Sequence, residues 1–349
     1  MLIMKLIKIY FIIALVGILL SQNSIDYSRQ NAITSAIKEV GPAVVGINVK
    51  GIEFQSPFRF MPFRPIEVES KGSGVVISPD GYIITNYHVV ENASKIFVTL
   101  AGGKQFDAEF VGWDELTDLA VLKLDGNNFP YVSMGNSDDL IIGEWVIALG
   151  NPFGLFDANQ QPTATIGIIS GKNLDFGLQD GKVYQNMIQT DAAINSGNSG
   201  GPLVNSKGEL IGINTFVYSG DYTSKGSSGF GFAIPINRAR SIAEELKRKG
   251  RINRGKLGFN VYTLNPRAAA YLNIPFYEGL FVTEILKNGP ASKAKLELED
   301  VIVEVEGEKV KNKDDFNEIL AIKNFRSGDK LKIRIWRRGR YLNRTIILG

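Results

Sequence analysis

The stretch T-D-A-A-I-N-S-G-N-S-G-G-P-L-V, from Thr190 to Val204, decides how the rest of this sequence is interpreted. Ser199 stands among glycines and precedes a short apolar run, so we expect its hydroxyl on a tight, uncrowded turn. Such a turn can direct the backbone N–H groups of Gly197 and Ser199 at one point, which is the geometry of an oxyanion hole. A glycine-rich hairpin with a solvated serine explains the same letters equally well. Whether the chain contains a suitable base elsewhere decides between a nucleophilic serine and a solvated one.

The chain contains a single histidine, His88, at the end of the strand-like run G-Y-I-I-T-N-Y-H-V-V. Asp118 follows in T-D-L-A-V-L-K-L, just ahead of another apolar run. Taken singly, such a histidine is more often a packed or surface residue and such an aspartate a turn residue. Together with Ser199 they give the order His, Asp, Ser, which is that of chymotrypsin-type proteases and not of subtilisins or α/β-hydrolases. We therefore interpret them as base, orienting acid and nucleophile.

Four longer motifs carry a family resemblance. They are G-S-G-V-V-I-S-P-D-G-Y-I-I-T-N-Y-H-V-V (Gly72 to Val90), T-D-L-A-V-L-K (Thr117 to Lys123), A-L-G-N-P-F-G (Ala148 to Gly154) and the stretch around Ser199. In this order they closely resemble the HtrA (Deg) serine endoproteases, from about residue 30 to the C-terminus. The resemblance implies a mainly β fold: a chymotrypsin-like double β-barrel followed by one PDZ domain, an α+β unit.

Short β-type runs separated by glycine and asparagine also indicate a barrel or a sandwich. The second barrel is expected from about Leu140 to Ile234, with the first barrel before it. His88 and Asp118 then lie on the first barrel and Ser199 on the second, which places all three at the cleft between the barrels.

Specificity is read from the residues before the nucleophile. Trypsin-like relatives carry an acid six positions before the serine, where this chain has Ala193, with Ile194 beside it. A Lys or Arg side chain in this S1 pocket would be left unpaired, so we predict cleavage after small or medium aliphatic residues. Asp191 is expected to point elsewhere and to serve the structure, as it does in the family.

Three segments are expected to be control loops. Phe54 to Ser70 is rich in Phe, Pro and Arg, and its prolines make it a poor strand. It packs on a neighbour, covers the active site or is solvated, and its position matches a family loop that can enter the active sites of neighbouring subunits. Lys172 to Gln185 and Tyr218 to Phe230 are rich in Gly, Ser and Asp and are expected to be mobile surface loops.

One departure from the family concerns activation. In the family these loops order the oxyanion hole when a peptide binds, and many members relay that signal through an arginine after the G-I-I-S strand. Leu174 occupies this place here, and Lys172 and Lys182 are the nearest cations. Activation of the protease by peptide binding at the PDZ domain is therefore left open.

Beyond the barrels, Asn237 to Gly250 has the spacing of an amphipathic helix with a glycine stop. K-L-G-F-N-V then begins the unit that resembles a PDZ domain, with Leu257, Gly258 and Phe259 as the implied carboxylate-binding loop. A peptide C-terminus would add as a strand beside this segment. L-E-L-E-D, which ends at Asp300, lacks the glycine that relatives usually place before the aspartate, a departure that affects a turn.

Residues 1–20 have two lysines followed by an uninterrupted apolar run, the pattern of a secretory signal. The run is short for a spanning helix, which needs about 20 residues, but no clear cleavage site follows. A cleaved signal, an uncleaved anchor and a buried strand are the alternatives. We expect export to the periplasm, with attachment to the inner membrane through these residues left open. The expected divisions are a signal or anchor at 1–25, a protease domain at 26–240, a helical linker at 241–255 and a PDZ domain at 256–349.

Composition narrows the chemistry. The chain has no cysteine, so disulfides, thiolate metal sites and cysteine nucleophiles are excluded. Its formal charge is +3 over 349 residues without a concentrated basic patch, so we expect no nucleic-acid partner. We expect no metal and no cofactor.

The resulting hypothesis is an ATP-independent serine endopeptidase that degrades unfolded or damaged exported proteins and binds peptide C-termini at its PDZ domain. Ile25 to Val40 has helical spacing and stops at Gly41 and Pro42. Family members build a trimer near such a segment, so the resemblance alone implies a homotrimer or a multiple of trimers. Two rivals are a membrane-anchored signalling protease that cuts one regulator and a chaperone or peptide-binding scaffold.

Overall fold

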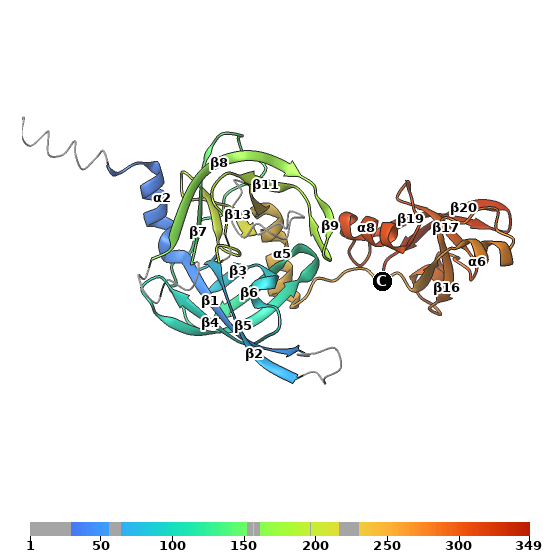
Figure 1. Cartoon of the computed structure of the whole chain (residues 1–349), viewed down its shortest axis with the longest axis horizontal. Coiled ribbons are helices and arrows are strands. Elements are labelled where there is room, and N and C mark those ends of the chain that lie inside the picture. The colour runs from blue at the N-terminus through green and yellow to red at the C-terminus, as the bar shows by residue number, and fades with distance from the viewer. Residues whose placement is uncertain (1–28, 56–63, 152–155, 157–160, 196, 216–229) are drawn as a thin grey trace, which may run out of the picture. The chain divides into compact units, whose positions relative to one another are not determined.

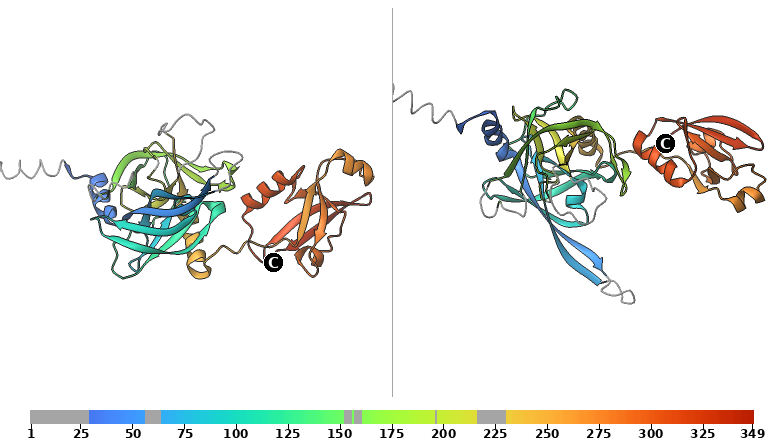
Figure 2. Two further views of the ribbon diagram at one scale, coloured as in Figure 1. Left: turned by 60° about the horizontal axis from the view of Figure 1, so that its bottom comes forward. Right: turned by 45° about the horizontal axis from the view of Figure 1, so that its top comes forward.

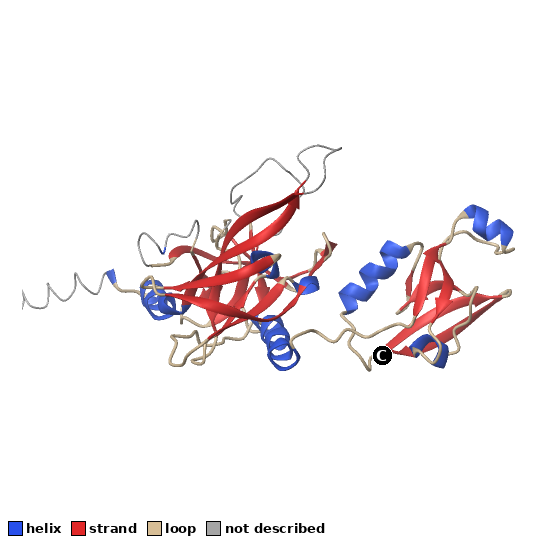
Figure 3. Ribbon diagram, turned by 90° about the horizontal axis from the view of Figure 1, so that it is seen from below, coloured by secondary structure: helices blue, strands red, loops and turns tan. Residues whose placement is uncertain are grey.

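The computed structural model describes residues 29–55, 64–151, 156, 161–195, 197–215 and 230–349 (Figure 1). The chain divides into two units. The first comprises Met1–Leu174 and Asn186–Gly250. The second comprises Asp175–Gln185 and Arg251–Gly349. Strands make up most of the regular structure of both units (Figure 3). The predicted mainly β architecture is therefore confirmed.

Six antiparallel strands of the first unit close into a barrel in the order β1-β2-β3-β6-β5-β4. Their bounds are β1 Val44–Gln55, β2 Arg64–Val76, β3 Tyr82–Thr85, β4 Ala93–Leu100, β5 Gln105–Asp114 and β6 Leu119–Leu124. Strand β6, L-A-V-L-K-L, buries every residue except the half-buried Lys123. Both faces of β6 are apolar because one lines the barrel while helix α5 (Ile236–Lys249) packs against the strand.

Strands β1 and β2 extend beyond the barrel as a two-stranded ribbon (Figure 2). Gln55 pairs with Arg64 at the far end of this ribbon, so both ends of the segment Phe54 to Ser70 are strands. The prediction that its prolines make it a poor strand was wrong at these ends. At this end of the ribbon β2 pairs only with β1. Pro65, which has no N–H to donate, therefore interrupts no hydrogen bonds to a second neighbouring strand. Residues 56–63 of the segment lie outside the described residues.

A second barrel of six antiparallel strands has the order β11-β14-β13-β12-β7-β8. Its strands are β7 Trp145–Gly150, β8 Thr163–Leu174, β11 Met187–Thr190, β12 Pro202–Asn205, β13 Leu210–Thr215 and β14 Gly231–Pro235. Its interior is apolar, and all six residues of β13, L-I-G-I-N-T, are buried. The buried polar residues at the end of β13 matter for the site described below.

Strands β9 (Gly177–Gln179) and β10 (Lys182–Tyr184) form a hairpin. Its turn residues Asp180 and Gly181 have φ of 49° and 79°, the positive pair that a type I′ turn requires. Lys172 to Gln185, predicted to be a mobile loop, is therefore mostly strand, and the Asp-Gly pair was the overlooked signal. The other predicted control loop, Tyr218 to Phe230, lies outside the described residues except for its last residue.

The helices of the first unit are α2 Ala32–Val40, α3 Tyr87–Val90 and α5, with 3₁₀ turns η1 Gly41–Ala43 and η2 Glu115–Thr117. A capping box starts α2, because the Asn31 side chain accepts from Thr34 N at 3.0 Å and Thr34 Oγ1 accepts from Asn31 N at 2.9 Å. The predicted helix end at Val40 is confirmed. Helix α5 ends at Lys249 and is capped by Gly250, whose φ of 70° is the left-handed conformation of a glycine cap.

Within the described ranges, no helix combines the length and the apolar character needed to cross a membrane. Residues 1–25, predicted to be a signal or an anchor, lie outside those ranges.

In the second unit, Arg251–Gly349 forms an antiparallel sheet in the order β15-β16-β17-β19-β20, with β18 paired to β17, while the β9-β10 hairpin is a separate two-stranded sheet. The strands are β15 Phe259–Thr263, β16 Leu280–Ile285, β17 Val301–Val305, β18 Glu308–Lys309, β19 Lys330–Arg337 and β20 Arg340–Ile347. The helices are α6 Pro266–Tyr271, α7 Pro290–Lys293 and α8 Lys313–Lys323. In β19 exposed and buried residues alternate over K-L-K-I-R-I, which is the pattern of a sheet with one solvated face.

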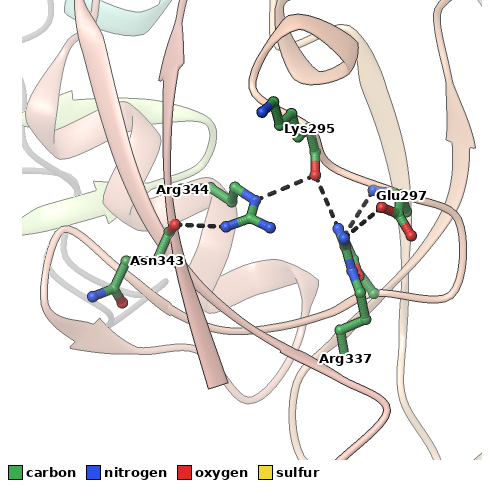
Figure 4. Close-up of polar contacts among 6 residues, drawn as sticks. Lys295, Glu297, Arg337, Asn343 and Arg344 are labelled. Carbon is green, nitrogen blue, oxygen red and sulfur yellow. Dashed lines mark hydrogen bonds and ion pairs between the residues drawn. The ribbon is translucent and has the colours of Figure 1, made fainter. Parts of the chain in front are cut away.

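A buried ion pair fixes the turn before β17. Asp300 is fully buried, and Arg337 donates to it from Nε at 2.5 Å and from Nη2 at 2.7 Å. Arg337 also donates to Glu297 and to the carbonyl of Lys295 (Figure 4). The hydrogen bond to Asp300 raises the pKa of Arg337. Glu299 has a φ of 71°, so this is a left-handed position where a glycine would be unstrained.

Candidate active site

The ring of His88 is held by Asp118. Its Nδ1 lies 2.7 Å from Asp118 Oδ2, and the main-chain N–H of His88 donates to Oδ1 at 3.0 Å. The Asp118 side chain is 1% exposed and that of His88 is 31% exposed. Because the buried carboxylate accepts from Nδ1–H, the neutral ring presents Nε2 as a proton acceptor. This half-exposed histidine can therefore act as a base toward a group in the cleft.

Asp118 occupies an unusual backbone conformation between η2 and β6. Its φ of 55° and ψ of 41° are left-handed, which is uncommon for a residue with a side chain. Its carbonyl accepts from the Asn86 side chain at 3.0 Å and from Tyr87 N at 3.1 Å. A third contact to the carboxylate comes from the second barrel, where Thr215 Oγ1 lies 3.4 Å from Oδ2. Strain of this kind persists where surrounding contacts over-determine it, as they do here.

Ser199 lies on a turn that only glycine neighbours permit. Gly200 has a φ of 82°, and a Cβ added to it would lie 2.2 Å from Ser73 O and 2.3 Å from Thr85 Oγ1. The turn is closed by two hydrogen bonds of 3.0 Å, from Asn198 N to Asn195 O and from Gly201 N to Asn198 O. Ser199 itself is 5% exposed. The turn is tight, as predicted, and its glycines serve close backbone packing.

Strand β13 brings this turn to the His88–Asp118 pair. Gly200 N donates to Asn214 O at 2.8 Å, and the next residue, Thr215, contacts the Asp118 carboxylate. His88 and Ser199 are both among the described residues, and no hydrogen bond joins the His88 ring to the Ser199 hydroxyl. In unliganded enzymes such bonds are often long and tighten only when substrate binds.

Two backbone donors of the turn have no acceptor among the described residues. They are the N–H groups of Gly197 and Ser199, whereas Asn198, Gly200 and Gly201 each donate to a carbonyl. Gly197 has a φ of 104°, which a residue with a side chain rarely adopts. Unpaired N–H groups on one turn are able to stabilise a negatively charged oxygen.

The segment before the turn is apolar. Ile194 is 4% exposed, and a Cβ on Gly231 of β14 would lie 3.0 Å from its Cδ1. The carbonyl of Ala193 accepts from Thr165 Oγ1 at 2.8 Å and from Asn198 Nδ2 at 3.3 Å. The carboxylate of Asp191 accepts from Ile168 N of β8 at 2.7 Å, so it serves the structure of the barrel.

The two lysines nearest to Leu174 in the sequence, one on β8 and one on β10, are both engaged. Lys172 Nζ donates to the carbonyl of Leu140 at 2.7 Å, and Lys182 also has a partner. Leu174 pairs with Met187 of β11.

In the second unit, Leu257, Gly258 and Phe259 lead into β15, an edge strand whose only strand partner among the described residues is β16. Gly258 has a φ of 75°, and its carbonyl accepts from Leu286 N at 2.9 Å. The ring of Phe259 lies 6.1 Å from that of Phe316 on α8. The free edge of β15 can therefore accept a further strand next to an apolar surface.

Sequence reasoning missed three buried polar residues around the site: Ser73, Asn214 and Thr215. Asn214 Nδ2 donates to Pro202 O at 3.0 Å and to Leu149 O at 3.3 Å, which ties β13 to β12 and β7. Ser73 stands in the G-S-G of the first family motif, where a serine between two glycines was the available signal. Among the residues that the structure covers, no group of three acidic or histidine side chains could hold a metal ion.

Two known family models match this chain. Residues 72–213 match the trypsin-like peptidase domain, and residues 255–348 match the PDZ domain. The first match contains all three residues of the His, Asp, Ser set.

Several known proteins are similar over most of this chain. A Chlamydia pneumoniae protein named "Probable periplasmic serine endoprotease DegP-like" is 42% identical over 83% of the chain, and one of the same name from Pseudomonas putida is 37% identical over 90%. The chain spans 58% and 69% of the lengths of these relatives. Among solved structures, the HtrA-type protease AlgW with a decapeptide has a TM-score of 0.65 and 34% identity, covering 91% of this chain and 98% of that one. The serine endoprotease from Yersinia pestis has a TM-score of 0.60 and 33% identity, covering 92% and 98%.

Proposed function

Because the chain belongs to the HtrA (DegP-like) family of serine endoproteases, we propose that it cleaves peptide bonds in unfolded or damaged proteins of the periplasm. The observation that carries this proposal is the 2.7 Å contact between His88 and the buried Asp118, beside the glycine turn of Ser199. Peptide hydrolysis is exergonic, so we propose no requirement for ATP.

In the proposed mechanism His88 removes the proton of the Ser199 hydroxyl as the oxygen attacks the substrate carbonyl. His88 then gives this proton to the leaving amine, and an acyl-enzyme remains on Ser199. Water, activated by the same histidine, releases the acid product. Asp118 keeps the proton on Nδ1 and stabilises the imidazolium that forms during both steps.

The N–H groups of Gly197 and Ser199 are the proposed donors to the oxyanion of the tetrahedral intermediate. Their lack of acceptors among the described residues supports this role. Losing one such donor costs about 100- to 1000-fold in rate.

We propose small or medium aliphatic residues at P1. The carboxylate of Asp191 is engaged by Ile168 N, and Ala193 and Ile194 present no charge that would pair with a basic side chain. A branched aliphatic side chain would bury against Ile194 without leaving a polar group unpaired.

The PDZ domain is proposed to bind peptide C-termini through Leu257, Gly258 and Phe259, with the peptide added to the free edge of β15. Substrate tails and activating peptides are the proposed ligands. Leu174 lies at the position of the usual relay arginine, so the proposed activation by peptide does not pass through a cation at that place.

Assembly and location follow the family. We propose a homotrimer or a multiple of trimers, and a location in the periplasm, which is where the names of the relatives place them. Residues 1–20 are proposed to direct export and, where they are not removed, to attach the protein to the inner membrane.

The test is digestion of an unfolded protein such as casein by the chain and by its Ser199→Ala variant, with and without a hydrophobic C-terminal peptide. Cleavage by the unsubstituted chain alone, without peptide, supports general degradation of unfolded proteins. Cleavage only with peptide supports the signalling alternative. If neither protein cleaves and both suppress aggregation, the protease proposal fails and the scaffold alternative replaces it.

A further inference from the structure

Ser73 is a buried serine of the first barrel that contacts the nucleophile turn of the second. It lies in β2 opposite Gly46 of β1 and is 0% exposed. Its main-chain N–H donates to Ser199 O at 3.0 Å, and its hydroxyl donates to Gly197 O at 2.5 Å. None of the sequence motifs gives this residue a function.

The direction of the Ser73 hydroxyl proton is fixed by its neighbours. Asn151 N lies 2.7 Å from Ser73 Oγ, and a backbone N–H can only donate, so the oxygen accepts there. A carbonyl can only accept, so the single hydroxyl proton points at Gly197 O. The hydroxyl therefore has one orientation, which is imposed by the start of the loop that follows β7.

These bonds hold the two peptide groups on either side of the Ser199 N–H. The peptide between Gly197 and Asn198 is bonded to Ser73 Oγ through its carbonyl and to Asn195 O through its N–H. The peptide that follows Ser199 is bonded to Ser73 N through its carbonyl and to Asn214 O through its N–H. The Ser199 N–H between them has no acceptor among the residues that the structure covers.

Building on the proposed function, we infer that Ser73 is a positioning residue that aims the Ser199 N–H group at the oxyanion. It touches neither substrate nor reacting atoms and acts through two peptide planes. The site is closely packed around it, because a Cβ on Gly150 would lie 2.9 Å from Ser73 Oγ and one on Gly201 would lie 3.2 Å from Ser73 Cβ. A serine hydroxyl fills the space between the barrels that these glycines leave.

The test is the Ser73→Ala variant of the full chain, assayed with an internally quenched peptide that has valine at P1. We expect kcat to fall about 10- to 100-fold while KM changes less than about threefold, because the ground state makes little use of oxyanion donors. A peptide trifluoromethyl ketone, which forms a tetrahedral oxyanion adduct with a serine, should lose affinity by the same factor as kcat. The same peptide ending in an uncharged primary amide, which forms no adduct, should bind with less than about a threefold change.

The matched control is Ser137→Ala, which removes another buried serine hydroxyl of the first unit, bonded to Asn237 N. It should leave kcat and both affinities unchanged. If Ser73→Ala does not fold, Ser73→Cys keeps one weak donor of similar size and should show a smaller loss of kcat with the same pattern.

An unchanged kcat in a folded Ser73 variant would overturn the inference. Equal loss of affinity for the ketone and for the peptide amide would also overturn it, because that result indicates a general distortion of the site. If the unsubstituted chain hydrolyses no peptide, the proposed function itself is contradicted. Failure of the proposed function is thereby distinguished from failure of the inference about Ser73.

Discussion

Asp118 holds His88 at two points, because one carboxylate oxygen lies 2.7 Å from the ring Nδ1 and the other accepts the main-chain N–H at 3.0 Å. Thr215 of the other barrel contacts the same carboxylate. The histidine is therefore fixed in both ring orientation and backbone position, while the carboxylate is shared between the barrels.

We predict that Asp118→Asn lowers kcat by about 10⁴-fold, because an amide can donate to Nδ1 and so favours the wrong tautomer of His88. The exposed Asp107→Asn on β5 should leave the rate unchanged. The measurement is steady-state hydrolysis of a peptide, with thermal unfolding to check the fold. A loss smaller than tenfold would remove Asp118 from the proposed mechanism.

Ile194→Val is predicted to shift P1 selectivity toward a larger residue. Removing one methylene from the wall of the pocket should change the ratio of kcat/KM for leucine over valine at P1 by about tenfold. Ile188→Val removes a methylene from the same core cluster and should give a similar loss of stability without the change in selectivity. An equal ratio in both variants would show that Ile194 does not line the pocket.

Glu299→Gly is predicted to stabilise the second unit by about 0.5–1 kcal/mol, because glycine relieves the left-handed strain at φ 71°. Hydrogen exchange of the core strand β17 measures this stability in the full chain. Glu299→Ala keeps the Cβ and therefore the strain, so it should show no comparable gain. Equal gains in the two variants would assign the effect to the lost carboxylate.

Arg337→Met is predicted to destabilise the second unit by about 3–5 kcal/mol, because it leaves the fully buried Asp300 without its partner. Lys323→Met breaks an exposed pair with Glu308 and should cost less than about 1 kcal/mol. Exchange of β17 again provides the measurement. Similar losses in both variants would contradict the role given to the buried pair.

The raised pKa of Arg337 gives the same ion pair a pH dependence. When folding raises the pKa of a group, that group stabilises the folded state at every pH below the ordinary arginine pKa. The stabilisation is lost only as the pH rises through the raised pKa of the folded state. Stability from this group should therefore stay constant up to about pH 10, as seen by exchange-monitored unfolding of β17 in unsubstituted protein. A decline below that pH, absent from Arg337→Met, would oppose the assignment.

Local sequence signals indicated a barrel or a sandwich, because apolar runs and glycine turns are short-range features, whereas the two barrels and the PDZ fold were implied by the family resemblance. The same signals failed at the ends of Phe54 to Ser70, where pairing with β1 outweighed the prolines. They could have succeeded at Asp180 and Gly181, whose turn type is a local property. The three proposed catalytic residues were found by their order along the chain, although the sequence contains no distance between them.

The sequence by itself determined the fold class and the family, and it led us to propose His88, Asp118 and Ser199 as the catalytic residues, because these depend on residue type and order. Only the tertiary structure showed that Ser73 of one barrel bonds to the Gly197 and Ser199 carbonyls of the other. It alone showed that Thr215 contacts Asp118 and that two N–H groups of the nucleophile turn have no acceptor within the described part of the chain. Such contacts join segments far apart in the chain, and hydrogen bonding depends on angles and distances that the packing of the two barrels sets.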